Sequence, residues 1–205
     1  MTPKATSSSS TTETPPPQMH FNLMKKQIVF VDANILFSKT LMDWLFFLRE
    51  ENPGMFQLIG TQDVFSEVLY NMRRSNPRAP GIRISRRLEL MKECIDSVVS
   101  DFPGGLDFSG ADKNDYHAHA AATSQDADFI LTQDRPSDFT SSPDNEVYEI
   151  IIPDDFFTLV ADSNPHLPSP YREETTGVLA GTSKPTTARR GSRSCSMPRI
   201  LGARQ

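Results

Sequence analysis

The sequence predicts an α/β domain, a three-layer α/β/α sandwich with a central parallel sheet. Short runs of β-branched and aromatic residues alternate along the chain with segments whose apolar residues recur at helical spacing. The strand-like runs are apolar throughout, which is typical of parallel strands that are buried on both faces. Asn, Pro and Gly residues separate the segments. Strands that alternate with helices in this way form parallel sheets covered on both sides.

Four strands and five helices account for this pattern. The strands are predicted at residues 27–31, 55–59, 127–132 and 146–152. Ser38 is predicted to cap the first helix, which Asn52-Pro53-Gly54 ends, and Thr61 is predicted to cap the second, which ends before Asn76-Pro77. The other helices are predicted at residues 82–99, 112–123 and 154–160.

Composition confines this fold to the middle of the 205-residue chain. Residues 1–24 are rich in Ser, Thr and Pro, and residues 163–205 are rich in Pro, Ser, Thr and Gly. Both segments lack the apolar residues that would offset the entropy lost on ordering. We therefore expect a disordered N-terminal extension at 1–24, one domain at 25–162 and a disordered basic tail at 163–205. A domain of about 138 residues is large enough for one core.

Charge and cysteine content narrow the class of protein. The whole chain carries a net charge of −5 and the tail carries about +5, so the domain carries about −10. Its only cysteine, Cys94, and the tail's Cys195 form no disulfide framework, which favours a reducing compartment. No apolar run has the ~18 residues of a membrane span, and no secretory signal begins the sequence. A cytoplasmic protein without a membrane partner is the expectation.

Four acidic residues have positions that suggest a shared site. Asp32 and Asp134 each follow a predicted strand, and the carboxyl ends of parallel strands meet at one edge of the sheet. Glu67 lies on the helix after the second strand, and Asp115 lies on a later helix, one turn after Asp112. Clustered carboxylates repel one another unless cations neutralise them, and Mg²⁺ or Mn²⁺ prefers such oxygen ligands. Two ions about 4 Å apart activate a water and stabilise the leaving oxygen of a phosphodiester.

Each of these residues also has a simpler interpretation. An Asp at a strand end often caps the next helix, and an exposed Glu on a helix is ordinarily solvated. Asp112 and Asp115 near a helix start would suit the helix dipole. The metal site is therefore predicted from the order and context of the residues taken together.

Taken in order, these motifs resemble those of PIN domains, the fold of VapC-type toxins of toxin–antitoxin pairs. The resemblance covers roughly residues 27–160. The motifs that carry it are VDANIL (31–36), SEV (66–68), DKNDYHAHAAA (112–122), ADFILTQD (127–134), SDF (137–139) and IPDDFF (152–157).

The resemblance implies that Asp32, Glu67, Asp115 and Asp134 form a metal site for Mg²⁺ or Mn²⁺. It also implies a homodimer, an RNA substrate and a small antitoxin partner. The chain departs from one bacterial branch of the family, where the fourth acidic position is often Asn. Asp138 therefore competes with Asp134 for that position. At the third position Asp115 is preferred to Asp112 because it stands two residues before His117.

Other residues near these motifs have predicted supporting roles. Asn34 and Thr132 are expected either to hydrogen-bond a ligand carboxylate or metal-bound water, or to form the turn and cap a helix. His117 and His119 alternate on a helix, so their side chains diverge and do not share one metal.

A basic segment runs from Arg73 to Lys92. Arg73, Arg74 and Arg78 are candidate RNA contacts. The alternatives are a solvated helix face that pairs with Glu89 and Glu93, or an antitoxin-binding surface.

The sequence therefore predicts a Mg²⁺- or Mn²⁺-dependent endoribonuclease, a phosphodiester hydrolase, with a type II toxin as its narrower identity. One alternative is a catalytically inactive PIN-like module that binds RNA or a protein partner. Another is a phosphatase or receiver-like domain with an Asp nucleophile, for which Thr132 is the only candidate hydroxyl at a later strand end.

Overall fold

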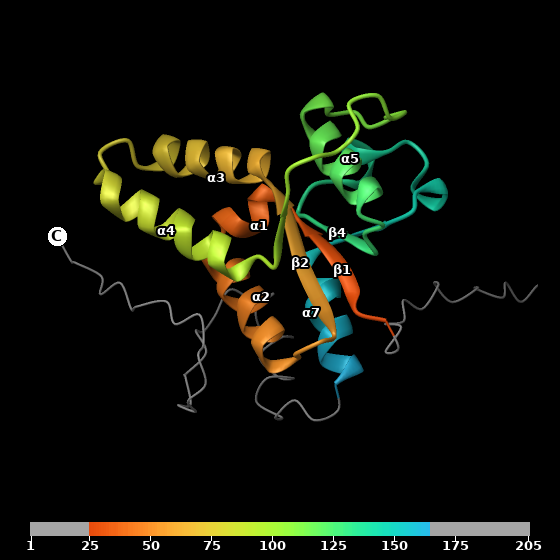
Figure 1. The fold of residues 1–205 in the computed structure, drawn as a ribbon, viewed down its shortest axis with the longest axis horizontal. Helices are drawn as coiled ribbons and strands as arrows, with labels where there is room; N and C mark the ends of the chain where they lie inside the picture. Colours follow the sequence, from red (N-terminus) through yellow and green to blue (C-terminus); the bar gives the residue numbers. More distant parts are fainter. Residues whose placement is uncertain (1–24, 165–205) are drawn as a thin grey trace, which may run out of the picture.

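The central feature of the fold is a five-stranded, all-parallel sheet with the strand order β3-β2-β1-β4-β5 (Figure 1). The computed structural model describes residues 25–164. The strands are β1 (Gln27–Val31), β2 (Phe56–Thr61), β3 (Ser97–Val99), β4 (Phe129–Leu131) and β5 (Glu149–Ile151). The sheet confirms the predicted α/β class. The predicted terminal segments, 1–24 and 163–205, lie outside the described residues, except for residues 163 and 164.

Helices flank this sheet on both sides. They are α1 (Ala33–Phe37), α2 (Lys39–Glu51), α3 (Gln62–Ser75), α4 (Gly81–Cys94), α5 (Tyr116–Ser124), α6 (Pro136–Phe139) and α7 (Pro153–Ser163), with 3₁₀ turns η1 (Lys113–Asp115) and η2 (Pro143–Asn145). Helix α2 packs against α7, and α5 packs against β2 and β4. The connection from β1 to β2 moves across the sheet in one direction, and the connection from β3 to β4 moves in the other. Because connections between parallel strands are right-handed, α2 and α5 lie on opposite faces of the sheet. Helices α3 and α4 form a hairpin that extends to one side (Figure 1).

Local sequence explains how several elements begin. The β1 residues Val29, Phe30 and Val31 are fully buried, as expected for a central parallel strand. The Ser38 hydroxyl accepts a hydrogen bond from the backbone N–H of Leu41, and the Thr61 hydroxyl accepts one from Val64. Both predicted helix caps are therefore confirmed.

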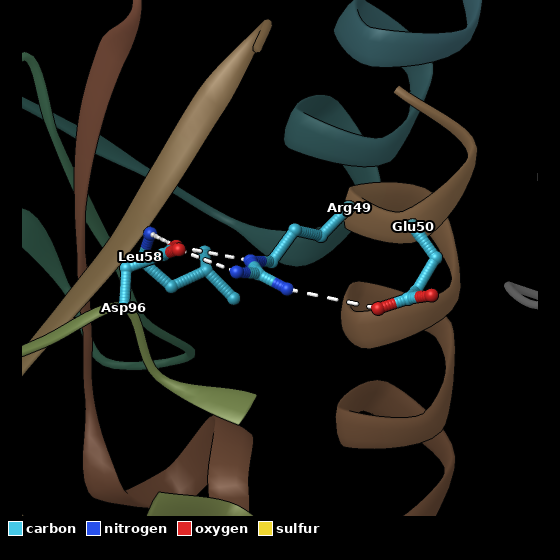
Figure 2. A network of polar contacts seen from close by, with 4 residues as sticks. All are labelled: Arg49, Glu50, Leu58 and Asp96. Atoms are coloured by element: carbon cyan, nitrogen blue, oxygen red, sulfur yellow. Dashed lines mark hydrogen bonds and ion pairs between the residues drawn. The ribbon is translucent and has the colours of Figure 1, made fainter. Parts of the chain in front are cut away.

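The prediction of a helix at residues 82–99 is wrong at the C-terminal end of that range. Helix α4 ends at Cys94, and residues 97–99 form the edge strand β3. Figure 2 shows the reason: the Asp96 carboxylate accepts hydrogen bonds from the Arg49 guanidinium and from the backbone N–H of Leu58. The backbone N–H of Asp96 in turn donates to the Leu58 carbonyl. These contacts come from distant segments, so the local apolar spacing does not reveal them.

Other predicted boundaries shift by a few residues. The strand predicted at 55–59 continues to Thr61, and the strands predicted at 127–132 and 146–152 shorten to three residues each. The helix predicted at 112–123 begins with the 3₁₀ turn η1 and becomes α-helical at Tyr116. Helix α6 was not predicted.

The main core fills the space between the sheet and its helices. Trp44 of α2 and Phe156 of α7 are buried, and the rings of Phe56 and Phe156 meet edge to face at 5.3 Å. No helix within residues 25–164 has both the length and the apolar character needed to cross a membrane.

Candidate acidic site at the carboxyl ends of the strands

Asp32 is the most buried of the four predicted carboxylates, with 5% of its surface exposed. It directly follows β1 and caps α1, where Oδ1 accepts a hydrogen bond from the backbone N–H of Ala33 at 2.6 Å. Its Oδ2 accepts from Asn34 Nδ2 at 2.8 Å and from the Thr132 hydroxyl at 2.7 Å. Burial raises the pKa of Asp32 to about 6, against the lowering effect of the Thr132 and Ala33 hydrogen bonds.

Asn34 joins Asp32 to Asp134. The Asn34 amide nitrogen lies 2.8 Å from Asp32 Oδ2 and 2.9 Å from Asp134 Oδ2. These two carboxylate oxygens are therefore less than about 6 Å apart, the sum of the two hydrogen-bond distances. The backbone N–H of Asp134 donates to the Thr132 hydroxyl at 3.0 Å, and that of Gln133 donates to the Asn34 side-chain oxygen at 3.2 Å. Asn34 and Thr132 thus fix the positions of both Asp residues.

Glu67 and Asp115 approach this pair from α3 and η1. Partial burial raises the pKa of Glu67, a hydrogen bond from Asn71 opposes this, and the charges of Asp134 and Asp112 raise it further. Partial burial also raises the pKa of Asp115 to about 7, reinforced by the negative charges of Asp32, Asp112, Asp134 and Glu67. The carboxylates from these four segments are therefore near enough for their charges to interact, on the side of the sheet where the strands end. We call the group of Asp32, Glu67, Asp115 and Asp134 the acidic rim.

The acidic rim has no cationic partner. None of its four carboxylates belongs to an ion pair within the described residues. Its donors are all carboxylate oxygens, which match the preference of Mg²⁺ or Mn²⁺. However, no group of three or more His, Cys, Asp or Glu in residues 25–164 is placed so that it could hold a metal ion. The donor chemistry therefore fits a divalent cation, whereas this arrangement contains no complete ligand set.

The two competing carboxylates have other local roles. Asp138 accepts a hydrogen bond from the backbone N–H of Arg135 at 3.1 Å and so caps α6. Asp112 Oδ1 accepts from the backbone and side chain of Asn114, both at 2.9 Å, and so caps η1. Asp112 still raises the pKa of both Glu67 and Asp115, so it lies close to the rim. The Asn34 side chain donates a hydrogen bond to Asp134.

The segment that positions Asp115, residues 101–112, was not predicted from the sequence to contribute to the site; we call it the strap. A Cβ at Gly110 would lie 2.2 Å from the Asp138 carbonyl oxygen and 2.8 Å from the carbonyl carbon of Phe139. Only glycine allows the strap to approach the α6 backbone this closely. The backbone N–H of Ala111 then donates to the Ser137 carbonyl at 2.9 Å. The only sequence signal was a lone glycine in a loop.

Tyr116 holds the other end of the strap. Its hydroxyl donates to the Pro103 carbonyl at 2.8 Å and accepts from the backbone N–H of Leu106 at 3.0 Å. Its ring packs edge to face on Phe108 at 5.8 Å. Because Tyr116 directly follows Asp115, these contacts fix the backbone that carries the rim carboxylate.

The two histidines of α5 have different surroundings. The Nδ1 of His117 lies 3.4 Å from the Thr61 hydroxyl, and burial lowers the pKa of His117. His119 is buried, and its Nδ1 lies 2.7 Å from the Tyr148 hydroxyl. The side chains therefore point to separate parts of the domain.

The predicted basic contacts lie at the far end of the α3–α4 hairpin. Arg73, Arg74 and Arg78 are exposed, and none of them forms an ion pair within residues 25–164. The predicted alternative of pairing with Glu89 or Glu93 is likewise not realised there. Arg73 Nη1 donates to the Ala79 carbonyl at 2.9 Å, which closes the hairpin. Two exposed guanidinium groups thus remain without a described partner.

Comparison with known proteins identifies the central part of the chain. The family model described as PIN domain matches residues 29–136, which is more than half of the chain. No curated protein and no solved structure gave a match. The matched residues include all four carboxylates of the acidic rim.

Proposed function

Because the chain belongs to the PIN domain family, whose members are generally nucleases, we propose that it is a divalent-metal-dependent endoribonuclease. The observation that carries this proposal is the acidic rim. The charges of Glu67 and Asp134 raise the pKa of Asp32 and of Asp115, and the charge of Asp134 raises that of Glu67, yet no ion pair neutralises these carboxylates in the described structure. A cluster of unpaired carboxylates costs free energy, and bound cations remove that cost.

The residues of the rim divide into ligands and supporting groups. Asp32, Asp115 and Asp134 are the proposed direct ligands of Mg²⁺ or Mn²⁺, and Glu67 binds a cation or its water. Asn34 and Thr132 hold Asp32 and Asp134 through hydrogen bonds of 2.7–3.0 Å, so these two carboxylates meet a cation already oriented. When bound, the cation supplies Lewis-acid stabilisation to a phosphodiester.

The decisive experiment removes one carboxylate without changing its shape. Wild type should cleave RNA with Mg²⁺ or Mn²⁺ and stop when EDTA is added. Asp32→Asn should cleave at least about 100-fold more slowly, which corresponds to about 2.7 kcal/mol. A matched control is Asp155→Asn, an exposed carboxylate in the first turn of α7 that does not belong to the rim. Cleavage by Asp32→Asn at the wild-type rate would contradict the proposal.

A second candidate is a catalytically inactive PIN-like module that binds RNA or a protein. The observation favouring it is that no complete metal-ligand set is found within residues 25–164. Calorimetric titration with Mn²⁺ separates the two candidates. The nuclease should show saturable binding that Asp115→Asn weakens, whereas the inactive module should show no tight site.

The narrower identity as a VapC-type toxin rests on the motif resemblance alone. It includes a homodimer, a small antitoxin partner and a cytoplasmic location. Induced expression should then arrest growth of a bacterial host, and Asp32→Asn should relieve that arrest. Sedimentation of the purified chain tests the dimer directly.

A further inference from the structure

One face of α3 connects the acidic rim with the exposed arginines. Glu67, Tyr70, Asn71 and Arg74 follow the i, i+3, i+4, i+7 spacing that places side chains on the same side of a helix. Glu67 and Asn71 share a hydrogen bond. At 1.5 Å per residue, Tyr70 stands about 4.5 Å and Arg74 about 10.5 Å beyond Glu67 along the helix axis. We call these four residues the α3 track.

Tyr70 is the unusual member of this track. Its side chain is 62% exposed, although the apolar face of α3 offers burial to Phe65 and Met72. Its neighbours on the track, Glu67, Asn71 and Arg74, are polar, and the adjacent Leu69 is 37% exposed. A protein interface would need a larger contiguous apolar area than these two side chains provide.

The sign of the charge also changes along the track. The rim end is acidic, and the far end carries exposed, unpaired Arg74. Two more exposed cations stand next to rim residues in the chain: Lys113 in η1 is two residues before Asp115, and Arg135 directly follows Asp134. Neither belongs to an ion pair in the described residues. A polyanion that reaches the rim would therefore meet positive charge at these residues as well as at Arg74.

We propose that the α3 track binds single-stranded RNA, with Tyr70 stacking on a base next to the cleaved phosphate and Arg74 holding a backbone phosphate further along. This rests on the proposed nuclease function and specifies the form of its substrate. An exposed ring binds a base face only when that base is free of its neighbours, which a single strand allows and a duplex does not. The guanidinium of Arg74 adds attraction that does not depend on sequence.

Binding is tested on the full chain carrying Asp32→Asn, so that RNA stays intact. The probes are a fluorescent unstructured oligoribonucleotide and the same sequence in a duplex, followed by anisotropy. Tyr70→Leu should weaken single-strand binding about tenfold and leave duplex binding unchanged, whereas Tyr70→Phe should restore it. Arg74→Gln should weaken binding and reduce the salt slope by about 0.7. Lys26→Gln, at the amino end of β1, makes the same charge change as a control.

Each result decides between the two proposals. If wild type cuts RNA but Tyr70→Leu binds and cuts like wild type, the α3 track is wrong and the nuclease proposal stands. If wild type never cuts RNA but binding of the single strand depends on Tyr70 and its ring, the track is right and the nuclease proposal fails. Equal losses for single strand and duplex would overturn the stacking role, as would an absence of RNA binding.

Discussion

Carboxylates at the two ends of the parallel strands have opposite surroundings. At the amino end of β3, burial alone would raise the pKa of Asp96, but its hydrogen bonds with Arg49 and the backbone of Leu58 lower it on balance (Figure 2). Asp128, before β4, is similarly used: its Oδ2 accepts from the backbone N–H of Ile28 at 2.8 Å. At the carboxyl ends, burial raises the pKa of Asp32 and Asp115, and no ion pair within residues 25–164 offsets this.

Carboxylates that are paired within the fold thus differ from those that we propose to be functional. A bidentate guanidinium satisfies Asp96 within the chain, so that carboxylate stabilises the fold and has nothing left to bind. The carboxylates of the acidic rim accept hydrogen bonds from Ala33, Asn34 and Thr132, but none of them forms an ion pair within residues 25–164. Carboxylates with raised pKa values of this kind are often found at functional sites. Four predictions test this division, from the largest expected effect to the smallest.

The first prediction replaces one carboxylate by an amide at each end of the parallel strands. Asp115→Asn should reduce the rate of RNA cleavage at least about 100-fold, or about 2.7 kcal/mol, because it removes a proposed metal ligand. Asp128→Asn should leave the rate per folded molecule within about twofold, since this residue lies at the other end of the strands. Single-turnover rates measure both. Similar losses in the two variants would abolish the distinction.

The second prediction concerns the strap. Gly110→Ala should lower the free energy of unfolding by about 2–3 kcal/mol, because the new Cβ would overlap the α6 backbone. It should also weaken Mn²⁺ binding, since the strap positions Asp115. Gly104→Ala is the matched control, as nothing lies within 4 Å of its added Cβ. Urea denaturation measures the free energy of unfolding, and calorimetry measures Mn²⁺ binding. Equal stability of the two variants would show that the strap shifts to accommodate the added Cβ at little cost in free energy.

The third prediction uses pH on the metal-free protein. The folded pKa values of Asp32, about 6, and Asp115, about 7, lie above the ordinary 3.8, so the folded state holds extra protons. Their contribution is favourable at low pH and is lost as pH rises from about 4 to about 7. We expect a decline of about 2 kcal/mol in the free energy of unfolding over this range. Mn²⁺ should reverse the decline, and Asp32→Asn should reduce it; a flat profile in wild type would contradict the acidic rim.

The fourth prediction has the opposite sign. The folded pKa of Asp96 is lowered, so its contribution is present above the ordinary pKa and is lost as pH falls through the folded value. Asp96→Asn should therefore destabilise the protein by about 1–2 kcal/mol at pH 7, and by less in strong acid. Thermal unfolding at both pH values measures this, with Asp101→Asn, an exposed loop carboxylate, as the control. An equal loss at both values would mean that the charge of Asp96 is unimportant.

The sequence by itself determined features that depend on neighbouring residues. The first strand was predictable because Val29 to Val31 are apolar without interruption, and the caps at Ser38 and Thr61 were predictable because a side chain there reaches an N–H three residues later. The order of the four acidic motifs also follows from the chain itself, and it was enough to indicate the family.

Only the tertiary structure decided what depends on residues far apart in the chain. Helix α4 stops at Cys94 because Asp96 is held by Arg49 and Leu58, which local apolar spacing does not encode. Asp134 meets Asn34 because strands β1 and β4, about 100 residues apart in the chain, pair side by side, whereas Asp138 accepts a hydrogen bond from the backbone N–H of Arg135. Local patterns fix the elements, and the packing between them fixes which side chains meet.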